Sequence, residues 1–241
     1  MLKNKCALVT GSGTGIGRAI ALRFAKEGAT VVLTGRKHAP IEEAAHQIRA
    51  SGGKAFAFAC DLSDETQVHT LCRQAAEAAG NIDILVNNAG ISKEMPFIEM
   101  PLSLWDEMVK CNLYSAVLMT KAVLPHMIRQ KSGVVINISS GAGLRGLPGS
   151  TAYSASKAAL IAFGQALGDE VRPHGLRVNT ICPGPVDTEM LKQSAVRDYL
   201  LKSGVKLFDP DEIASAALFL ATDMSGKMNS QVLVMRDGNR W

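Results

Sequence analysis

The chain has 241 residues, of which 47% are hydrophobic and 20% charged, and its formal net charge is +4. This composition excludes a disordered chain, and the interspersed charges, without a basic block, argue against a nucleic-acid partner. Every long apolar stretch is broken well short of the roughly 18 residues that a membrane span needs, and the apolar run at the N-terminus leads into glycines instead of a cleavage site. We therefore expect a cytoplasmic protein with no membrane-spanning segment.

Short β-branched apolar runs alternate along the chain with longer segments of helical spacing. The runs predict strands at residues 5–10, 30–34, 55–60, 82–87, 134–139, 177–182 and 232–235. The segments predict helices at residues 15–28, 41–51, 65–80, 105–130, 153–173 and 211–222. This alternation indicates βαβ units and hence a parallel sheet covered on both faces. No linker or repeat divides the chain, so we predict one doubly wound α/β Rossmann-type domain over residues 1–241, with seven strands in the order 3-2-1-4-5-6-7.

Ligands of such sheets bind outside the carboxyl ends of the strands, and a glycine-rich turn follows the first predicted strand. Its spacing is Gly11-x-x-x-Gly15-x-Gly17, and a helix follows directly. Glycines permit a tight turn and let the backbone touch a pyrophosphate, whose charge would lie on the free N–H groups of the helix N-terminus. The spacing differs from G-x-G-x-x-G, yet the order of strand, turn and helix predicts a dinucleotide site. The alternative is a merely structural turn.

The end of the second predicted strand bears on the choice of dinucleotide. NAD enzymes carry an acidic residue there for the ribose 2′-hydroxyl. This chain has Gly35, which leaves room, and Arg36, whose planar guanidinium suits a 2′-phosphate. We predict NADP(H) as the cofactor; the alternative is a solvated basic turn that leaves the 2′ position without a contact.

Tyr153 and Lys157 lie four residues apart at the start of a predicted helix, so both can approach one bound ligand. A free tyrosine has a pKa near 10, which a nearby ammonium and an oxidised nicotinamide would lower. Ser140 follows a predicted strand and could hydrogen-bond the substrate oxygen in line with Tyr153. The alternative is a helix-capping serine with an amphipathic Tyr/Lys pair.

Taken together, the motifs resemble the compact single-domain branch of the short-chain dehydrogenase/reductase family, and within it most of all the 3-oxoacyl-thioester (acyl-carrier-protein) reductases. The resemblance rests on residues 10–17, Asn87-Asn88-Ala89-Gly90, Asn112, Ser140, Tyr153-x-x-x-Lys157 and Pro183-Gly184. It covers essentially the whole chain in order.

The resemblance implies an NADP(H)-dependent oxidoreductase that interconverts a carbonyl and a secondary alcohol, with Tyr153 as general acid and base. The implied catalytic residues are Asn112, Ser140, Tyr153 and Lys157. The implied cofactor-binding residues are Gly11, Ser12, Thr14, Gly15, Ile16, Gly17, Arg36, Asp61, Leu62, Asn88, Ala89, Gly90, Tyr153, Lys157, Pro183, Gly184, Val186 and Thr188. Asn112 would stabilise a helix kink and hold a water that links Lys157 to solvent. Asn87 would also line the cofactor cleft, with Asp61 at the adenine and Thr188 at the nicotinamide end.

The chain departs from the family pattern in two places. Many NADP members carry a basic residue before the second motif glycine, where this chain has Thr14. Near the C-terminus, Asn229-Ser230 replaces a usual Thr-Gly, and residues 237–241 lack the usual glycine pair. The first departure leaves Arg36, with Lys37 as a second candidate, to discriminate without that help, and the second bears on a C-terminal subunit contact.

The remaining expectations concern substrate, assembly and competing functions. We expect an apolar carbonyl or alcohol substrate under a helical lid at residues 186–208, and a homotetramer or homodimer. The histidines lack metal-ligand spacing, so we expect no metal, and the five cysteines are expected to be free thiols. Ser154-x-x-Lys157 fits an acyl-transfer motif, but the partner motifs S-D-N and K-T-G are absent from the sequence. The alternative function is a catalytically idle NADPH-binding sensor or scaffold.

Overall fold

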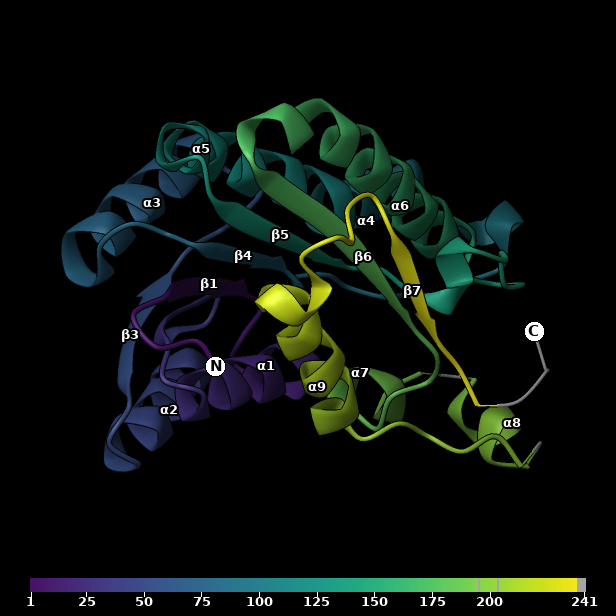
Figure 1. Ribbon diagram of the computed structural model, residues 1–241. Helices are drawn as coiled ribbons and strands as arrows, with labels where there is room; N and C mark the ends of the chain where they lie inside the picture. Colours follow the sequence, from purple (N-terminus) through teal and green to yellow (C-terminus); the bar gives the residue numbers. More distant parts are fainter. Residues whose placement is uncertain (195, 203, 238–241) are drawn as a thin grey trace.

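The computed structural model describes residues 1–194, 196–202 and 204–237. Within these residues, seven parallel strands form one sheet in the order β3-β2-β1-β4-β5-β6-β7 (Figure 1). The strands are β1 (Cys6–Thr10), β2 (Thr30–Gly35), β3 (Lys54–Ala59), β4 (Ile84–Asn87), β5 (Gly133–Ile138), β6 (Leu176–Pro183) and β7 (Val232–Met235). The predicted fold class and strand order are confirmed, and strand boundaries agree within two residues.

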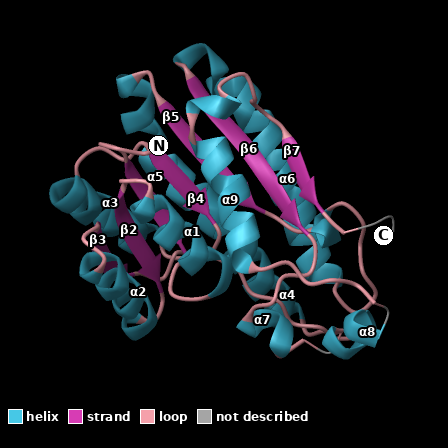
Figure 2. Ribbon diagram, turned by 60° about the horizontal axis from the view of Figure 1, so that its bottom comes forward, coloured by secondary structure: helices cyan, strands magenta, loops and turns pink. Residues whose placement is uncertain are grey.

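Helices cover both faces of the sheet, as Figures 1 and 2 show. On one face lie α1 (Gly15–Lys26), α2 (His38–Ala50) and α9 (Pro210–Ala221). On the other lie α3 (Glu65–Ala79), α5 (Ser115–Gln130) and α6 (Thr151–Val171). Two short helices, α7 (Glu189–Lys192) and α8 (Arg197–Lys202), occupy the predicted lid, of which residues 195 and 203 lie outside the described residues. In such folds ligands bind at the carboxyl ends of the strands.

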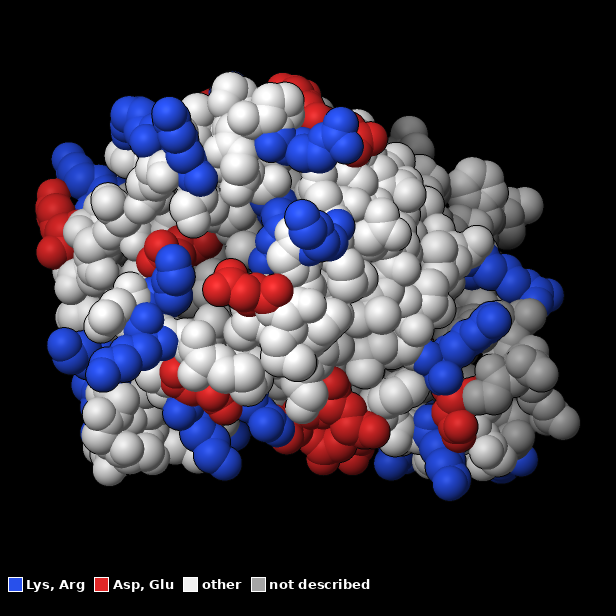
Figure 3. Space-filling model, in the orientation of Figure 1, with Lys and Arg blue, Asp and Glu red and all other residues white. Residues whose placement is uncertain are grey.

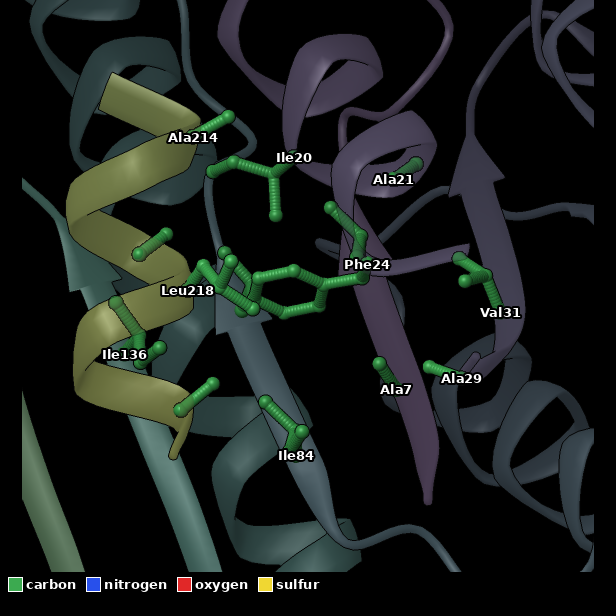
Figure 4. Packing of buried hydrophobic residues seen from close by; sticks show 14 of the residues in the cluster. Ala7, Ile20, Ala21, Phe24, Ala29, Val31, Ile84, Ile136, Ala214 and Leu218 are labelled. Atoms are coloured by element: carbon green, nitrogen blue, oxygen red, sulfur yellow. The ribbon is translucent and has the colours of Figure 1, made fainter. Parts of the chain in front are cut away.

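The core that holds α1 and α9 against the sheet is built from aliphatic side chains and one aromatic ring (Figure 4). Phe24 of α1 and Ile20 one turn earlier are fully buried, and Leu218 of α9 packs with them. Small residues such as Ala21 and Ala214 let the two helices approach the strands closely. Because burial of each large apolar side chain stabilises the fold by about 1.5–3 kcal/mol, this layer fixes the glycine-rich turn at the start of α1.

The helix predicted over residues 105–130 is interrupted in the structure. It consists of α4 (Leu102–Val109), a π-helical segment (Lys110–Tyr114) and then α5. Within the π segment, the Asn112 side chain accepts a hydrogen bond from the backbone N–H of Ile91 at 2.7 Å and donates to its carbonyl at 3.0 Å. A π turn contains one residue more than an α turn. Helical periodicity in the sequence does not predict this insertion, because a tertiary contact holds the π turn.

The atypical C-terminal pair has a clear structural role. Ser230 adopts the left-handed conformation, with φ of 59°, where a glycine would carry no steric cost. Asn229 accepts a hydrogen bond from Val178 N at 2.8 Å and donates to Gly168 O at 2.7 Å, so its side chain ties β6 to α6. Residues 238–241, the rest of this departure, lie outside the described residues.

Charges of both signs are interspersed over the face of the molecule drawn in Figure 3, which bears no stripe of one sign. Among the described residues, no helix combines the length and the hydropathy required to cross a bilayer. Over the same residues, no group of three or more His, Cys, Asp or Glu side chains gathers where it could hold a metal ion.

Arg177 supports the far end of α9, and its removal is expected to destabilise the fold. Its guanidinium donates to the carbonyl oxygens of Leu220 at 3.0 Å, Thr222 at 3.2 Å and Ser225 at 3.2 Å. In Arg177→Met these carbonyls lose charge-assisted bonds, each of which contributes about 1.5–3 kcal/mol when removed singly. Because contributions within one network are not additive, we expect a total loss of about 2–4 kcal/mol. Thermal unfolding should show a Tm lower by roughly 5–12 °C. Arg172→Met, at an exposed position, is the control, and an equal Tm for the two variants would contradict the prediction.

Candidate active site

A cleft opens at the carboxyl ends of β1, β2 and β4, where the parallel sheet places its ligand site. Eleven of the residues that line it were predicted to bind cofactor: Gly11, Thr14, Gly15, Ile16, Arg36, Asp61, Leu62, Asn88, Ala89, Gly90 and Thr188. The lining also includes Gly35, which the sequence analysis placed at the 2′ position, and Glu189 and Met190 of the predicted lid. The sequence analysis missed five further lining residues: Cys60, Ser63, Ile91, Cys111 and Ser115. Several of these directly follow a strand or a predicted residue, and that position is the signal that could have found them.

The glycine-rich turn forms one wall of the cleft and has the shape of a pyrophosphate cradle. Gly11 and Gly15 have φ of 61° and 53°, and a Cβ on Gly17 would lie 2.3 Å from the Gly11 carbonyl oxygen. Asn88 fixes the turn, because its side-chain amide donates to the carbonyls of Thr10 at 2.9 Å and Gly11 at 3.1 Å. The first turn of α1 has neither a side-chain cap nor an acidic residue, so its N–H groups and positive dipole end remain available to an anion.

Arg36 and Asp61 flank the opposite end of the cleft. The pKa of the Asp61 carboxyl is lowered, first by hydrogen bonds from the Ser63 backbone and hydroxyl and further by the charge of Arg36. The carboxylate accepts those two bonds at 3.0 Å and 2.7 Å. An ionised acid therefore faces an exposed guanidinium where the sequence predicts the adenosine end of the dinucleotide.

The predicted catalytic side chains come together where β5 ends and α6 begins. The Lys157 ammonium lies 5.9 Å from the centre of the Tyr153 ring, and the Ser140 side chain is near enough to act on the pKa of the Tyr153 hydroxyl. Lys157 is only 4% exposed, and its Nζ donates to the carbonyl oxygen of Ile138 at 2.9 Å. The Tyr153 residue is half-buried, whereas Lys157 is covered.

The predicted lowering of the Tyr153 pKa is wrong for the protein alone. Burial raises the pKa of the Tyr153 hydroxyl, and the hydrogen bond with Ser140 opposes that rise only in part. Burial also lowers the pKa of Lys157 to about 8, so its ammonium loses its proton more readily than a lysine in water. The interpretation from spacing omitted desolvation, which disfavours the phenolate and the ammonium alike.

Asn112 links the π segment to the catalytic residues at the start of α6. Its Nδ2 also donates to the Ser156 hydroxyl of α6 at 3.0 Å. A Cβ on Gly90 would lie 2.9 Å from Asn112 Oδ1 and 3.4 Å from Lys157 Nζ, so these three residues meet around a backbone that leaves no room for a side chain. The π segment stands where the family resemblance implied a helix kink.

Some predicted residues face elsewhere. The Ser12 hydroxyl is buried and accepts a hydrogen bond from Thr34 N at 2.9 Å. Asn87 points into the sheet, where its amide donates to Thr120 and Asn137, both at 3.0 Å. Six further residues that were predicted to bind the cofactor are not among those that line this cleft: Gly17, Tyr153, Lys157, Pro183, Gly184 and Val186.

A phosphate cradle that leads to a tyrosine, a lysine and a serine at the edge of a parallel sheet defines a dinucleotide-binding oxidoreductase. The sequence pattern of the short chain dehydrogenase family matches residues 5–198. The 3-oxoacyl-(acyl-carrier-protein) reductase FabG of Chlamydia trachomatis serovar D is 39% identical over 99% of this chain and 98% of its own length. FabG of Thermotoga maritima is 34% identical over 98% of both chains.

Solved structures show the same likeness. The crystal structure of levodione reductase superimposes with a TM-score of 0.93 at 29% identity, covering 98% of this chain and 97% of that chain. A short-chain type dehydrogenase/reductase from Mycobacterium marinum gives a TM-score of 0.93 at 31% identity, over 98% and 95% of the two chains. The protein belongs to the short-chain dehydrogenase family and resembles its 3-oxoacyl-(acyl-carrier-protein) reductases. It is an oxidoreductase that interconverts carbonyl and alcohol groups by hydride transfer with a nicotinamide cofactor.

Proposed function

We propose that the protein is an NADP(H)-dependent carbonyl reductase in which Tyr153 is the general acid and base. The meeting of Tyr153, Ser140 and the buried Lys157 ammonium, which lies 5.9 Å from the centre of the Tyr153 ring, carries this proposal. Two hydroxyls that lie close together can both hydrogen-bond to a single substrate oxygen.

The cleft supplies the contacts that the cofactor needs. The turn from Gly11 to Gly17 and the start of α1 would hold the pyrophosphate, and Arg36 would meet the 2′-phosphate. Lys157, Asn88 and Gly90 would hold the nicotinamide ribose end. When bound, the cofactor supplies or accepts the hydride. Because β2 ends at Gly35 and Arg36 follows it, with no acidic residue there, we infer a preference for NADP(H) over NAD(H).

In the reductive direction, Tyr153 donates its hydroxyl proton to the carbonyl oxygen as that oxygen gains electrons. Ser140 donates a hydrogen bond to the same oxygen and orients it toward Tyr153. The positive charge of Lys157 stabilises the phenolate that remains. Asn112 and Lys157 both approach Gly90 in the loop after β4, where Asn112 would hold the water that returns the proton. The product is the alcohol, which has gained one hydride and one proton.

The substrate class follows from the residues around the site and from the named relatives. We infer an apolar ketone or 3-oxoacyl thioester as substrate, with one domain over residues 1–241 and residues 186–208 as its lid. Met190 and Leu201 of this segment are 45% and 44% exposed, as expected for apolar residues that a bound substrate would cover. Assembly as a homotetramer or homodimer belongs to the same proposal.

The test is consumption of NADPH and of NADH with a panel of 3-oxoacyl thioesters, diketones and cyclic ketones. We expect turnover of at least one class and a higher kcat/KM with NADPH. Tight NADPH binding without turnover of any compound in either direction would instead support the sensor or scaffold function.

The pH dependence of reduction is expected to report Lys157. A lysine whose pKa is lowered to about 8 is charged below that pH and neutral above it. Tyr153, whose pKa is raised, keeps its proton throughout the neutral range. The reductive kcat/KM should therefore be constant through neutral pH and fall as the pH rises through about 8. A rate profile that declines only near pH 10, where an ordinary lysine titrates, would contradict this assignment.

A further inference from the structure

The predicted lid, residues 186–208, is fixed at its two ends. Val186 and Phe208 pair there as a short parallel bridge. The Asp187 N–H donates to the carbonyl oxygen of Phe208 at 2.9 Å, and the Phe208 N–H donates to Pro185 O at 2.8 Å. Helices α7 and α8 lie between these ends, beyond the arrowheads of β6 and β7 (Figure 2). Because both ends are fixed at one point, the position of the middle of the lid depends on contacts farther along it.

Ser194, between α7 and α8, makes such a contact. Its hydroxyl donates a hydrogen bond to the carboxylate of Glu94, which lies in the loop after β4. The hydroxyl oxygen also accepts a hydrogen bond from the Val196 N–H at 3.3 Å, so the same side chain begins the turn into α8. A hydrogen bond to an ionised acceptor is about twice as strong as one between neutral groups. The bond therefore attaches the middle of the lid to a loop 100 residues earlier in the chain.

The loop that carries Glu94 is held on both sides of that residue. Before it, the Ile91 backbone N–H and carbonyl are both hydrogen-bonded to the Asn112 side chain. After it, the Met95 N–H donates to the carbonyl oxygen of Gly149 at 2.8 Å, in the segment that leads into α6. Glu94 therefore lies on backbone that is attached to the elements of the catalytic site, and its partner lies on the lid.

We propose that Glu94 is a positioning residue that holds the lid over the active site through the Ser194 hydroxyl. The inference rests on the proposed function, since it assumes that residues 186–208 cover the substrate. Glu94 acts through the lid and raises the fraction of molecules in which the lid is closed. The apparent affinity of a ligand falls in proportion to the fraction of protein that is competent to bind it, so loss of the bond should raise KM. The catalytic side chains keep their places, so kcat should change little.

The kinetic experiment compares Glu94→Ala and Glu94→Gln with Glu99→Ala as a matched control. Glu99 lies in the same connection between β4 and α4, is exposed, and gives the same change of net charge when replaced. We expect Glu94→Ala to raise KM for the carbonyl substrate about tenfold, as loss of one charge-assisted hydrogen bond implies, with kcat changed less than twofold. Glu94→Gln keeps an acceptor for Ser194 and should restore most of the affinity. Glu99→Ala should have the KM of the wild type.

A double-variant cycle tests whether Glu94 and Ser194 act as a pair. Ser194→Ala should raise KM about as much as Glu94→Ala does. The double variant Glu94→Ala/Ser194→Ala should show about the same tenfold rise, because one hydrogen bond can be lost only once. A rise of about a hundredfold in the double variant would mean two independent contacts and would overturn the assignment.

Limited cleavage by trypsin measures opening of the lid without any substrate. Lys192 of α7 and Lys202 of α8 are exposed, so both offer cleavage sites within the lid. When opening and closing are fast, the cleavage rate follows the population of the open state. We expect cleavage after these two lysines, followed by mass spectrometry, to be about tenfold faster in Glu94→Ala and in Ser194→Ala than in the wild type. Glu99→Ala should be cleaved at the wild-type rate.

Wild-type KM and cleavage rate in Glu94→Ala would overturn the inference, as would equal effects of Glu94→Ala and Glu99→Ala. A fall in kcat at unchanged KM would also overturn it, because Glu94 would then act in the chemical step. If Glu94→Ala fails to fold, Ser194→Ala must show both the higher KM and the faster cleavage. If the wild type turns over no compound, the proposed function fails and the cleavage rates still test the lid contact. Turnover by the wild type, with unchanged cleavage in both variants, removes this inference alone.

Discussion

Replacing Tyr153 with phenylalanine is expected to lower kcat for carbonyl reduction by about a thousandfold, which lies within the range for loss of a positioned general acid. The change removes one oxygen and keeps the ring, so the helix start and the packing beside Lys157 should persist. Ser140 can still hydrogen-bond to the substrate oxygen, but the variant has no hydroxyl at residue 153 to donate a proton to that oxygen. KM for the substrate and Kd for NADPH should therefore change little, which places the loss in the chemical step.

Tyr114→Phe is the matched control for this prediction. Tyr114 is 56% exposed and ends the π segment, so the same loss of a hydroxyl there should leave kcat unchanged. Equal kcat for Tyr153→Phe and the wild type would show that another group donates the proton. A large rise in Kd for NADPH would show that Tyr153 mainly binds the cofactor.

The fold was predictable because it depends on patterns that are local in the chain. A buried parallel strand reads as a short apolar run, and each crossover must hold a helix, so the alternation predicts a parallel sheet. The strand order came from the doubly wound fold class and is the one observed. The π segment from Lys110 to Tyr114 was not predictable, because a contact with Ile91, 21 residues away from Asn112, maintains it. Periodicity averages over such a local insertion.

The site was predictable where function requires a spacing, as in the interval from Tyr153 to Lys157. The protonation behaviour of the site was not predictable, because it depends on burial. The raised pKa of Tyr153 and the lowered pKa of Lys157 come from the protein around them, which no spacing reports. Strand alternation could have shown that Asn87 and Asn88 point in opposite directions, and the structure indeed turns one into the sheet and the other to the cleft.

Arg36→Asp is expected to reverse the cofactor preference, with the ratio of kcat/KM for NADPH to that for NADH falling by about a thousandfold. A guanidinium that binds a phosphate through two charge-assisted hydrogen bonds contributes about 1.5–3 kcal/mol with each, and every 1.4 kcal/mol is a factor of about ten. In the variant, the new carboxylate would stand beside the ionised Asp61 at the same end of the cleft and repel a 2′-phosphate. It would instead accept a hydrogen bond from the 2′-hydroxyl of NADH.

Lys37→Asp separates this specific contact from general electrostatics. Lys37 follows Arg36, is also exposed, and gives the same change of net charge when replaced. If Arg36 binds the phosphate as a planar fork, Lys37→Asp should change the ratio by less than about tenfold, with an effect that salt screens. Titrations of the cofactors' own fluorescence, without substrate, should show the same order in Kd. Equal effects of the two variants would mean that the local potential, and not Arg36 itself, selects the cofactor; an unchanged ratio in both would place the 2′-phosphate elsewhere.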